Sequence, residues 1–159
     1  RRPARSTSRR RKVSKADNPM HYWWERDGVR FECTACGRCC GGEPGSIWVT
    51  PAERARIAGE LGIDEIALRK EYLTRREGRC SIKEMENYDC IFLERNSRRC
   101  KIYKVRPLQC RLFPFWPSIL KDKKVWNFYA NRCPGMNNGK YYSPEIIKKF
   151  LNLPSAEIL

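Results

Sequence analysis

The stretch "CTACGRCC", residues 33–40, places four cysteines within eight positions. Cysteine that serves only as a small apolar core residue has no reason to gather in this way. The candidates for such a cluster are a disulfide knot, a redox thiol, a zinc site and an iron–sulfur cluster. The chain holds nine cysteines in 159 residues, whereas a secreted disulfide scaffold usually has an even number in a shorter chain. We therefore infer a reducing compartment in which thiolates are kept for metal.

The chemistry of thiolates narrows the choice of metal. Soft thiolate ligands select zinc, copper(I) or iron–sulfur clusters. The C-x2-C-x2-C spacing resembles the start of a bacterial ferredoxin run but departs from it at once, because Cys40 directly follows Cys39. Since adjacent residues of an extended chain point to opposite sides, we expect Cys39 and Cys40 not to bind the same ion. A cysteine-only set in a tight loop favours iron–sulfur slightly over zinc, and the single histidine, His21, excludes a Cys2His2 finger.

A second group of cysteines follows in "YDCIFLERNSRRCKIY", residues 88–103. Apolar, β-prone runs on both sides of a polar turn predict a β-hairpin. If the turn is centred on Arg95, Cys90 lies opposite Cys100 with their Cβ atoms about 5 Å apart. The pattern therefore predicts that these two cysteines are ligands of one centre.

The remaining cysteines lie near prolines or glycines. Cys110 follows a proline, and Cys133 precedes "PG", so rigid backbone can aim both thiolates. Arg106 and Arg111 flank Cys110 in the sequence, and their charge would lower a thiolate pKa and offset the charge of a cluster. Cys80 has no such setting, and we interpret it as a small buried residue.

These residues together resemble a known family. The segments "FECTACGRCC", "YDCIFLE", "RRCKIYKVRPLQCRLFPF" and "NRCPGM" are similar to the YkgJ-like cysteine-cluster family, which is named for its CxxCxxCC motif and described as chelating zinc or iron. The similarity covers about residues 29–140 and leaves Cys80 outside the motif. A related domain occurs in flagellin lysine N-methylases, which are larger than this chain. Carried over position by position, the resemblance implies metal ligands at Cys33, Cys36, Cys39, Cys40, Cys90, Cys100, Cys110 and Cys133.

We expect an α+β fold: a small irregular metal-stabilised domain over residues 21–159, with short β-hairpins, a few short helices and a C-terminal helix. Residues 1–20 are expected to form a disordered basic arm. Capping signals predict helices that start after Thr50, Asp64 and Ser143. Short strands are expected at residues 29–31, 47–49 and 125–130, and an irregular segment over residues 106–117.

The charge of the chain is uneven. The net charge is +15, and residues 1–15 contribute eight basic and no acidic side chains. Such an arm is typical of electrostatic attachment to a polyanion, although a remnant of an organelle-targeting segment or a plain solvated tail has the same composition. The residues expected to contact RNA phosphates are Arg1, Arg2, Arg5, Arg9, Arg10, Arg11, Lys12 and Lys15.

Three functions remain open at this point. The first is a metal- or iron–sulfur-binding structural or assembly protein of a large RNA–protein complex, with an organellar ribosome (mitochondrion or plastid) favoured over a cytoplasmic setting. Its partners would be RNA and neighbouring proteins. The second is a cluster-dependent enzyme related to protein lysine N-methylases, and the third is a metal chaperone or redox sensor. Catalysis is the less favoured reading, because no nucleotide fingerprint or His-centred constellation is present. No apolar run approaches the roughly 20 residues of a membrane span, so no membrane is expected among the partners.

Overall fold

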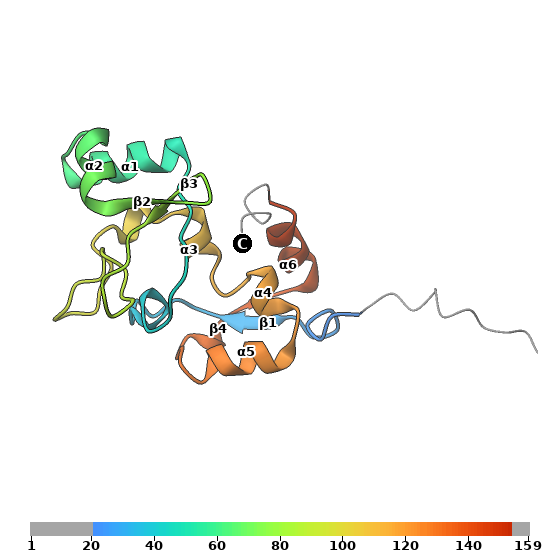
Figure 1. The fold of residues 1–159 in the computed structure, drawn as a ribbon. Coiled ribbons are helices and arrows are strands. Elements are labelled where there is room, and N and C mark those ends of the chain that lie inside the picture. Colours follow the sequence, from blue (N-terminus) through green and yellow to red (C-terminus); the bar gives the residue numbers. More distant parts are fainter. Residues whose placement is uncertain (1–20, 154–159) are drawn as a thin grey trace, which may run out of the picture.

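The computed structural model describes residues 21–153, which fold as α+β (Figure 1). The predicted basic arm, with its eight candidate RNA-binding residues, lies outside these described residues. None of the helices in residues 21–153 has the length and apolar character needed to cross a membrane. The helices and strands form two groups, which Figure 1 shows at the upper left and lower right, with α3 drawn between them.

The first group consists of two helices and a hairpin. Helix α1 spans Pro51–Leu61 and α2 spans Glu65–Tyr72, and strands β2 (Leu73–Arg76) and β3 (Arg79–Ile82) pair in antiparallel fashion directly after α2. Their apolar faces pack with the segment that follows, which includes the 3-10 turn η2 (Tyr103–Val105). We call this cluster the α1–α2 core, and it is made of Val49, Ile57, Ala58, Leu68, Leu73, Ile82, Phe92 and Ile102.

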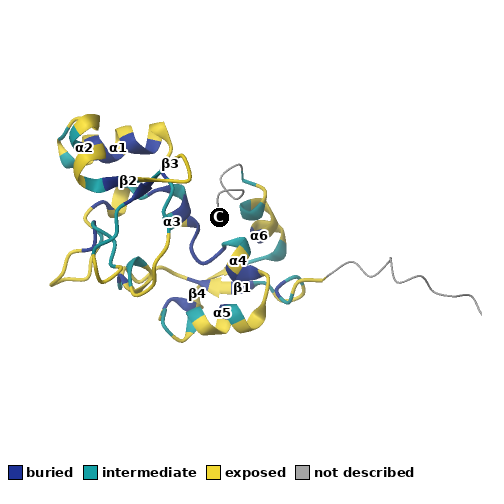
Figure 2. Cartoon of the chain, in the orientation of Figure 1, coloured by how far each residue is buried: buried dark blue, intermediate teal, exposed yellow. Residues whose placement is uncertain are grey.

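The second group joins the two ends of the domain. Strand β1 (Val29–Phe31) pairs antiparallel with β4 (Met136–Tyr142), and helices α4 (Pro117–Leu120), α5 (Lys123–Ala130) and α6 (Pro144–Leu151) pack around them. Figure 2 shows buried residues on the inward sides of these elements. We call this cluster the α5–α6 core, and it is made of Trp24, Val29, Phe31, Phe113, Phe115, Ile119, Leu120, Trp126, Met136 and Ile147.

The three predicted helix starts are confirmed. Thr50 and Glu53 form a reciprocal capping box at the start of α1, the Asp64 side chain accepts from the amide of Ala67, and Ser143 caps α6. Each cap satisfies an amide that the first helical turn leaves without a partner. Local capping chemistry was therefore enough to place these helices.

The predicted strand at residues 125–130 is wrong, because these residues belong to helix α5. Asp122 caps the helix by accepting from the amide of Lys124 at 2.7 Å. Val125, Trp126 and Tyr129 then share one helical face, and Trp126 is fully buried in the α5–α6 core. The predicted strand at residues 47–49 is reduced to a single bridge between Trp48 and Ser81.

The predicted hairpin at residues 88–103 is also wrong. Consecutive turns break this segment, and only two isolated bridges form, Glu84 with Cys90 and Leu93 with Cys100. The regular hairpin lies instead at β2–β3, where Glu77 and Gly78 turn the chain with φ values of 50° and 76°. Glycine adopts positive φ at little cost, so Gly78 was the local signal for this turn.

Helix α3 (Leu108–Leu112) is held in place by polar contacts to α1 and to residues 46–48. The buried side chain of Gln109 accepts from the amide of Trp48 at 2.8 Å and donates to the carbonyl of Ser46 at 2.9 Å. The Glu53 carboxylate, besides capping α1, accepts from the amide of Leu108 at 2.8 Å. These contacts fix the position of α3 and of the cysteine that it carries.

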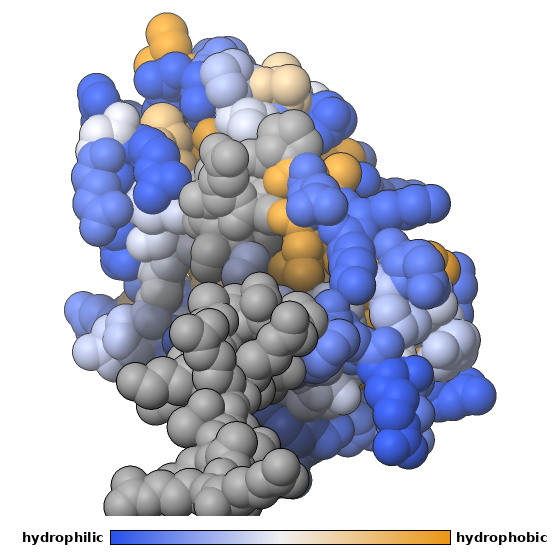
Figure 3. Space-filling model, turned by 90° about the vertical axis from the view of Figure 1, so that its right-hand side faces the viewer, coloured by the Kyte–Doolittle hydropathy of each residue, from blue (hydrophilic) through white to orange (hydrophobic). Residues whose placement is uncertain are grey.

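Few large hydrophobic side chains are exposed among residues 21–153. Outside the grey residues, the face shown in Figure 3 is mostly hydrophilic, with separate hydrophobic patches. Exposed apolar or aromatic residues among residues 21–153 include Ile66, Phe128 and Tyr141. Scattered residues of this kind are normal on protein surfaces and suggest no binding site.

Candidate metal centre

All eight cysteines implicated by the sequence line one cavity of about 70 Å³. The ninth, Cys80, does not line it. Phe31 and Phe113 of the α5–α6 core contribute to the wall, as do Phe92 and Ile102 of the α1–α2 core. The cavity therefore lies at the junction of the two cores, with thiols from residues distant in the sequence. The thiols come from Cys33, Cys36, Cys39, Cys40, Cys90, Cys100, Cys110 and Cys133.

The first four cysteines lie on a loop that glycine makes possible. Gly37 is buried with φ 68° and begins a short 3-10 turn, η1 (Arg38–Cys40). A Cβ atom on Gly37 would lie 2.1 Å from the carbonyl oxygen of Arg98, so no other residue fits without backbone movement. The loop thus packs directly against the turn that precedes Cys100.

The expectation that Cys39 and Cys40 point apart is wrong. It assumed extended chain, whereas both residues lie in the 3-10 turn η1. Their sulfur atoms are 3.9 Å apart, and two thiolates of a tetrahedral zinc site with bonds of about 2.3 Å are separated by about 3.8 Å. The spacing therefore permits these adjacent residues to share one metal.

Cys90 and Cys100 both line the cavity, although their predicted register is wrong. Cys100 bridges to Leu93 instead of lying opposite Cys90. A tight turn closes between Glu94 and Arg99, and a second turn brings the amide of Leu93 to the carbonyl of Cys90 at 2.8 Å. The two thiols reach the same cavity from successive turns, so their joint role as ligands stays a prediction.

Burial and mutual repulsion oppose the charged form of several thiols. Burial, together with the neighbouring Cys100 and Cys39 thiolates, raises the pKa of Cys90 to about 11. Burial likewise raises the pKa of Cys110, and the hydrogen bond that the Cys39 thiol donates to the Cys40 thiolate, followed by burial, raises that of Cys39. Burial also raises the pKa of Cys100. A bound cation relieves the repulsion among thiolates, and metal binding therefore releases protons here.

The pKa of the Cys33 thiol is shifted in the opposite direction, downward. Burial works against its charged form, but hydrogen bonds from Tyr103, the backbone of Ala35 and Arg106 lower the pKa of its thiol. The Arg106 guanidinium lies 3.6 Å from the centre of the Tyr103 ring, and its Nη1 is 3.8 Å from the Cys33 sulfur. The expected influence of Arg106 on a thiolate is thus seen at Cys33. Arg111, by contrast, lies outside the cavity on the exposed side of α3.

The donor set fits a metal–sulfur centre. Eight thiols around one cavity suit zinc or iron–sulfur ligation. Within residues 21–153, no three cysteine, histidine or acidic side chains form a compact group that could hold an ion. The thiols line the wall of the cavity instead. Arg106 Nε is buried without a hydrogen-bond partner among the described residues, and a metal–sulfur centre held by the neighbouring thiols would supply acceptors.

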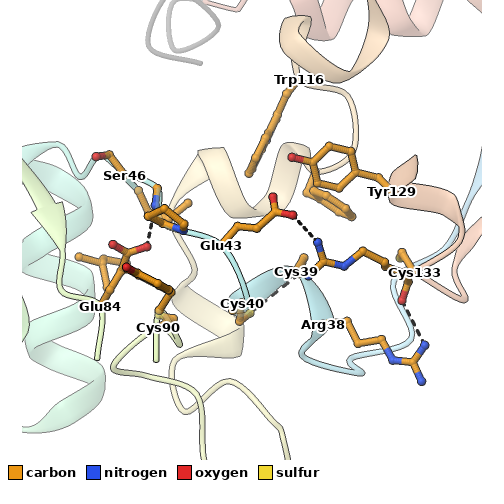
Figure 4. Close-up of a pocket in the computed structure, with 18 of the residues that line it drawn as sticks. Arg38, Cys39, Cys40, Glu43, Ser46, Glu84, Cys90, Trp116, Tyr129 and Cys133 are labelled. Atoms are coloured by element: carbon orange, nitrogen blue, oxygen red, sulfur yellow. Dashed lines mark hydrogen bonds and ion pairs between the residues drawn. The ribbon is translucent and has the colours of Figure 1, made fainter. Parts of the chain in front are cut away.

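A second cavity, of about 160 Å³, adjoins the thiols (Figure 4). Cys39, Cys40, Cys90 and Cys133 line both cavities. Its outer wall is polar and aromatic: Arg132 Nη1 pairs with the Glu43 carboxylate at 2.6 Å, and Trp116 and Tyr129 lie nearby. The sequence singled out none of these four residues, because no motif marks them. This vestibule is large enough for a small polar group.

Fold and cavity define a cysteine-rich α+β domain with a thiol-lined cavity at the junction of its two cores. The chain belongs to the CxxCxxCC family, described as "Putative zinc- or iron-chelating domain", whose model matches residues 32–134. Membership supports metal binding and agrees with the cofactor class expected from the sequence, zinc or iron–sulfur. The matched region contains all eight cavity cysteines and ends before β4 and α6.

Two proteins of Methanocaldococcus jannaschii are similar to this chain. Uncharacterized protein MJ0661 is 31% identical over 135 residues, which cover 79% of this chain and 72% of that protein. Uncharacterized protein MJ0939 is 26% identical over 138 residues, and the match covers 84% of this chain but only 45% of that protein. No solved structure matches the chain.

We predict that Cys110→Ser lowers the metal content and destabilises the fold, whereas Cys80→Ser does neither. Cys110 lines the cavity and is only partly exposed, whereas Cys80 lies outside it. Metal binding contributes about 10–16 kcal/mol in small zinc domains, so a lost ligand has a large effect. Elemental analysis of protein purified without oxygen, together with denaturant unfolding, measures both quantities. Equal metal content in the two variants would contradict the assignment.

We predict that Gly37→Ala also reduces metal content without removing a ligand. Its positive φ costs about 1–2 kcal/mol for an L-residue, and the added Cβ meets the Arg98 carbonyl. Gly45→Ala is the matched control, since no atom lies within 4 Å of its added Cβ. The metal-to-protein ratios of the two purified variants test this prediction. A normal metal content in Gly37→Ala would show that the loop tolerates another backbone conformation.

Proposed function

We propose that this protein is a metal- or iron–sulfur-binding structural or assembly component of a large RNA–protein complex, with an organellar ribosome as the favoured setting. The structural part of the proposal is carried by one observation: the thiol cavity takes its walls from both cores. A metal held there would tie together two small apolar clusters. Its contribution, about 10–16 kcal/mol for zinc in small domains, is comparable to a typical domain stability of about 5–15 kcal/mol.

The RNA part of the proposal is supported by charge. The first 15 residues carry eight basic side chains, and the other 144 residues carry +7. Phosphate contacts position a protein on nucleic acid without reading bases. No aromatic residue is interleaved among the eight basic ones to stack on bases. We therefore expect the arm to attach the metal domain to RNA in a sequence-independent way.

We predict a steep salt dependence of RNA binding that depends on the arm. If all eight side chains contact single-stranded RNA, the slope of log affinity against log salt is about −5 to −6, because each neutralised phosphate contributes roughly −0.7. An arm-neutral chain, in which all eight are replaced by glutamine, should lose that part of the slope. Fluorescence anisotropy with labelled RNA over a salt series measures it.

The control is a chain whose arm arginines are replaced by lysine, which keeps the charge and should keep the slope. Metal content should be equal in all three chains, since no cysteine lies in the arm. If the arm-neutral chain binds RNA with undiminished affinity and the same slope, the arm is not the RNA contact and its targeting interpretation gains support.

A second function is favoured by the vestibule beside the thiols. Its polar wall and its four shared cysteines would let a small substrate approach the metal centre, as a cluster-dependent enzyme requires. A catalytic metal keeps an open coordination position and a structural metal does not. A metal chaperone or redox sensor would instead hold its metal in a labile way.

Adding an exogenous ligand to the metal-loaded protein distinguishes a structural centre from an enzyme, and adding a chelator distinguishes it from a chaperone. We predict that cyanide or imidazole leaves the absorption spectrum of the metal-loaded protein unchanged, as expected for a centre whose positions are all filled by thiolates. A ligand-dependent shift would favour the enzyme. Rapid transfer of the metal to a chelator, without unfolding, would favour the chaperone.

A further inference from the structure

A groove lined by arginines lies apart from the thiol cavity. Its volume is about 550 Å³, and it is bordered by α1, the β2–β3 hairpin and α3. Cys110 and Arg111 are neighbours on α3, yet the first lines the thiol cavity and the second lines this groove. Glu53 is the one acidic residue among the described residues that line it. The arginines are Arg54, Arg56, Arg69, Arg75, Arg79 and Arg111.

Carboxylates neutralise only part of this charge. Glu65 pairs with both Arg54 and Arg69, at 2.9 and 3.0 Å. The Glu53 carboxylate is occupied by the amides of Thr50 and Leu108.

Among the described residues, three guanidinium groups of the groove have no acidic partner. Arg56, Arg75 and Arg111 are exposed and form no ion pair within residues 21–153. Arg75 does donate to the carbonyl of Gly78 at 3.1 Å, which orients its side chain along the groove-lining hairpin. Several positive charges in one concave surface raise the local concentration of anions.

The groove also has an aromatic element. The Arg79 guanidinium stacks over the Trp48 ring at 3.9 Å from its centroid, and both residues line the groove. Glu77 approaches Arg79 only to 3.6 Å, at the exposed end of the hairpin. A stacked guanidinium is held flat and presents its N–H groups in a fixed direction, which suits recognition of phosphate oxygens.

We propose that this groove binds the phosphate backbone of RNA. The guanidinium groups of Arg56, Arg75 and Arg111, which form no ion pair within residues 21–153, come from three separate elements around an open space. This arrangement suits successive phosphates of a chain rather than a single anion. The choice of RNA as the polyanion rests on the proposed function, whereas the groove and its charge do not. The folded domain would then hold RNA itself, in addition to the arm.

The test compares four metal-loaded full-length chains: the wild type, the arm-neutral chain, a groove variant (Arg56→Gln, Arg75→Gln and Arg111→Gln) and their combination. Labelled single-stranded RNA is titrated over a salt series. Three lost phosphate contacts should reduce the steepness of the slope by about 2. The same reduction should appear with and without the arm charges, because the two surfaces act independently.

A charge-matched control separates the groove from net charge. Arg95→Gln, Lys121→Gln and Lys124→Gln remove three exposed positive charges that do not line the groove. This variant should change the slope by much less than the groove variant. If both variants reduce the slope equally, or if the groove variant leaves it unchanged, the groove is not an RNA site. Should the triple groove variant fold poorly, Arg56→Gln and Arg111→Gln alone should each reduce the slope by about 0.7.

Failure of the inference and failure of the proposed function give different results. If the wild type binds RNA and only the arm-neutral substitutions weaken it, the proposed function stands and the groove inference falls. If no chain binds RNA, the proposed function falls. Inorganic phosphate and a nucleoside triphosphate then serve as probes, and binding that the groove variant loses would assign the groove to a small phosphate ligand instead of RNA.

Discussion

The sharing of one thiol cavity by two apolar cores is the constraint on which the rest of this domain depends. Neither core is large, and their main internal contacts stay within each group of elements: β1 with β4 and α4 with α5 on one side, α1 with α2 and β2 with β3 on the other. Between them lie the cysteine loop, the turns that carry Cys90 and Cys100, and the short helix α3. A metal bound there supplies a cross-link that a domain with a divided core needs.

Sequence reasoning succeeded where chemistry is local. The spacing of the cysteines and the caps at Thr50 and Ser143 depend on a few neighbouring residues, and the structure brings all eight implicated thiols to one cavity. Sequence reasoning failed where contacts between distant parts of the chain determine the local conformation. Residues 125–130 are mainly apolar and aromatic, as in a strand, yet they form a helix that buries Trp126 in the α5–α6 core. The apposition of Cys39 and Cys40 depends on the left-handed Gly37, whose effect on direction cannot be read from spacing.

Short segments, rather than long helices or strands, build much of the thiol cavity, the vestibule and the arginine groove. Helix α3 has five residues, yet it supplies a thiol to the metal cavity, an arginine to the groove and, through Gln109, the contacts that hold the segment at residues 46–48. The sequence "RPLQCRLFPFWP" indicated the thiol of Cys110 as a ligand, but it suggested irregular chain and marked neither the helix nor the contacts of Gln109. A Glu53 carboxylate 55 residues away fixes the first amide of this helix. Acceptors that are distant in the sequence explain why a segment predicted to be irregular forms a helix in a defined position.

The pairing of β1 with β4 has a consequence for how the protein is made. Arg30 and Gly139, which are joined by a hydrogen bond, are 109 positions apart in the chain, so β1 stays without its partner strand until nearly the whole domain has been synthesised. Non-local strand pairing of this kind is slow, because loop closure precedes any stabilising contact. At about 5–20 residues per second, the first four thiols of a nascent chain wait for several seconds, accessible to oxygen and to adventitious metal, before their native surroundings can close over them.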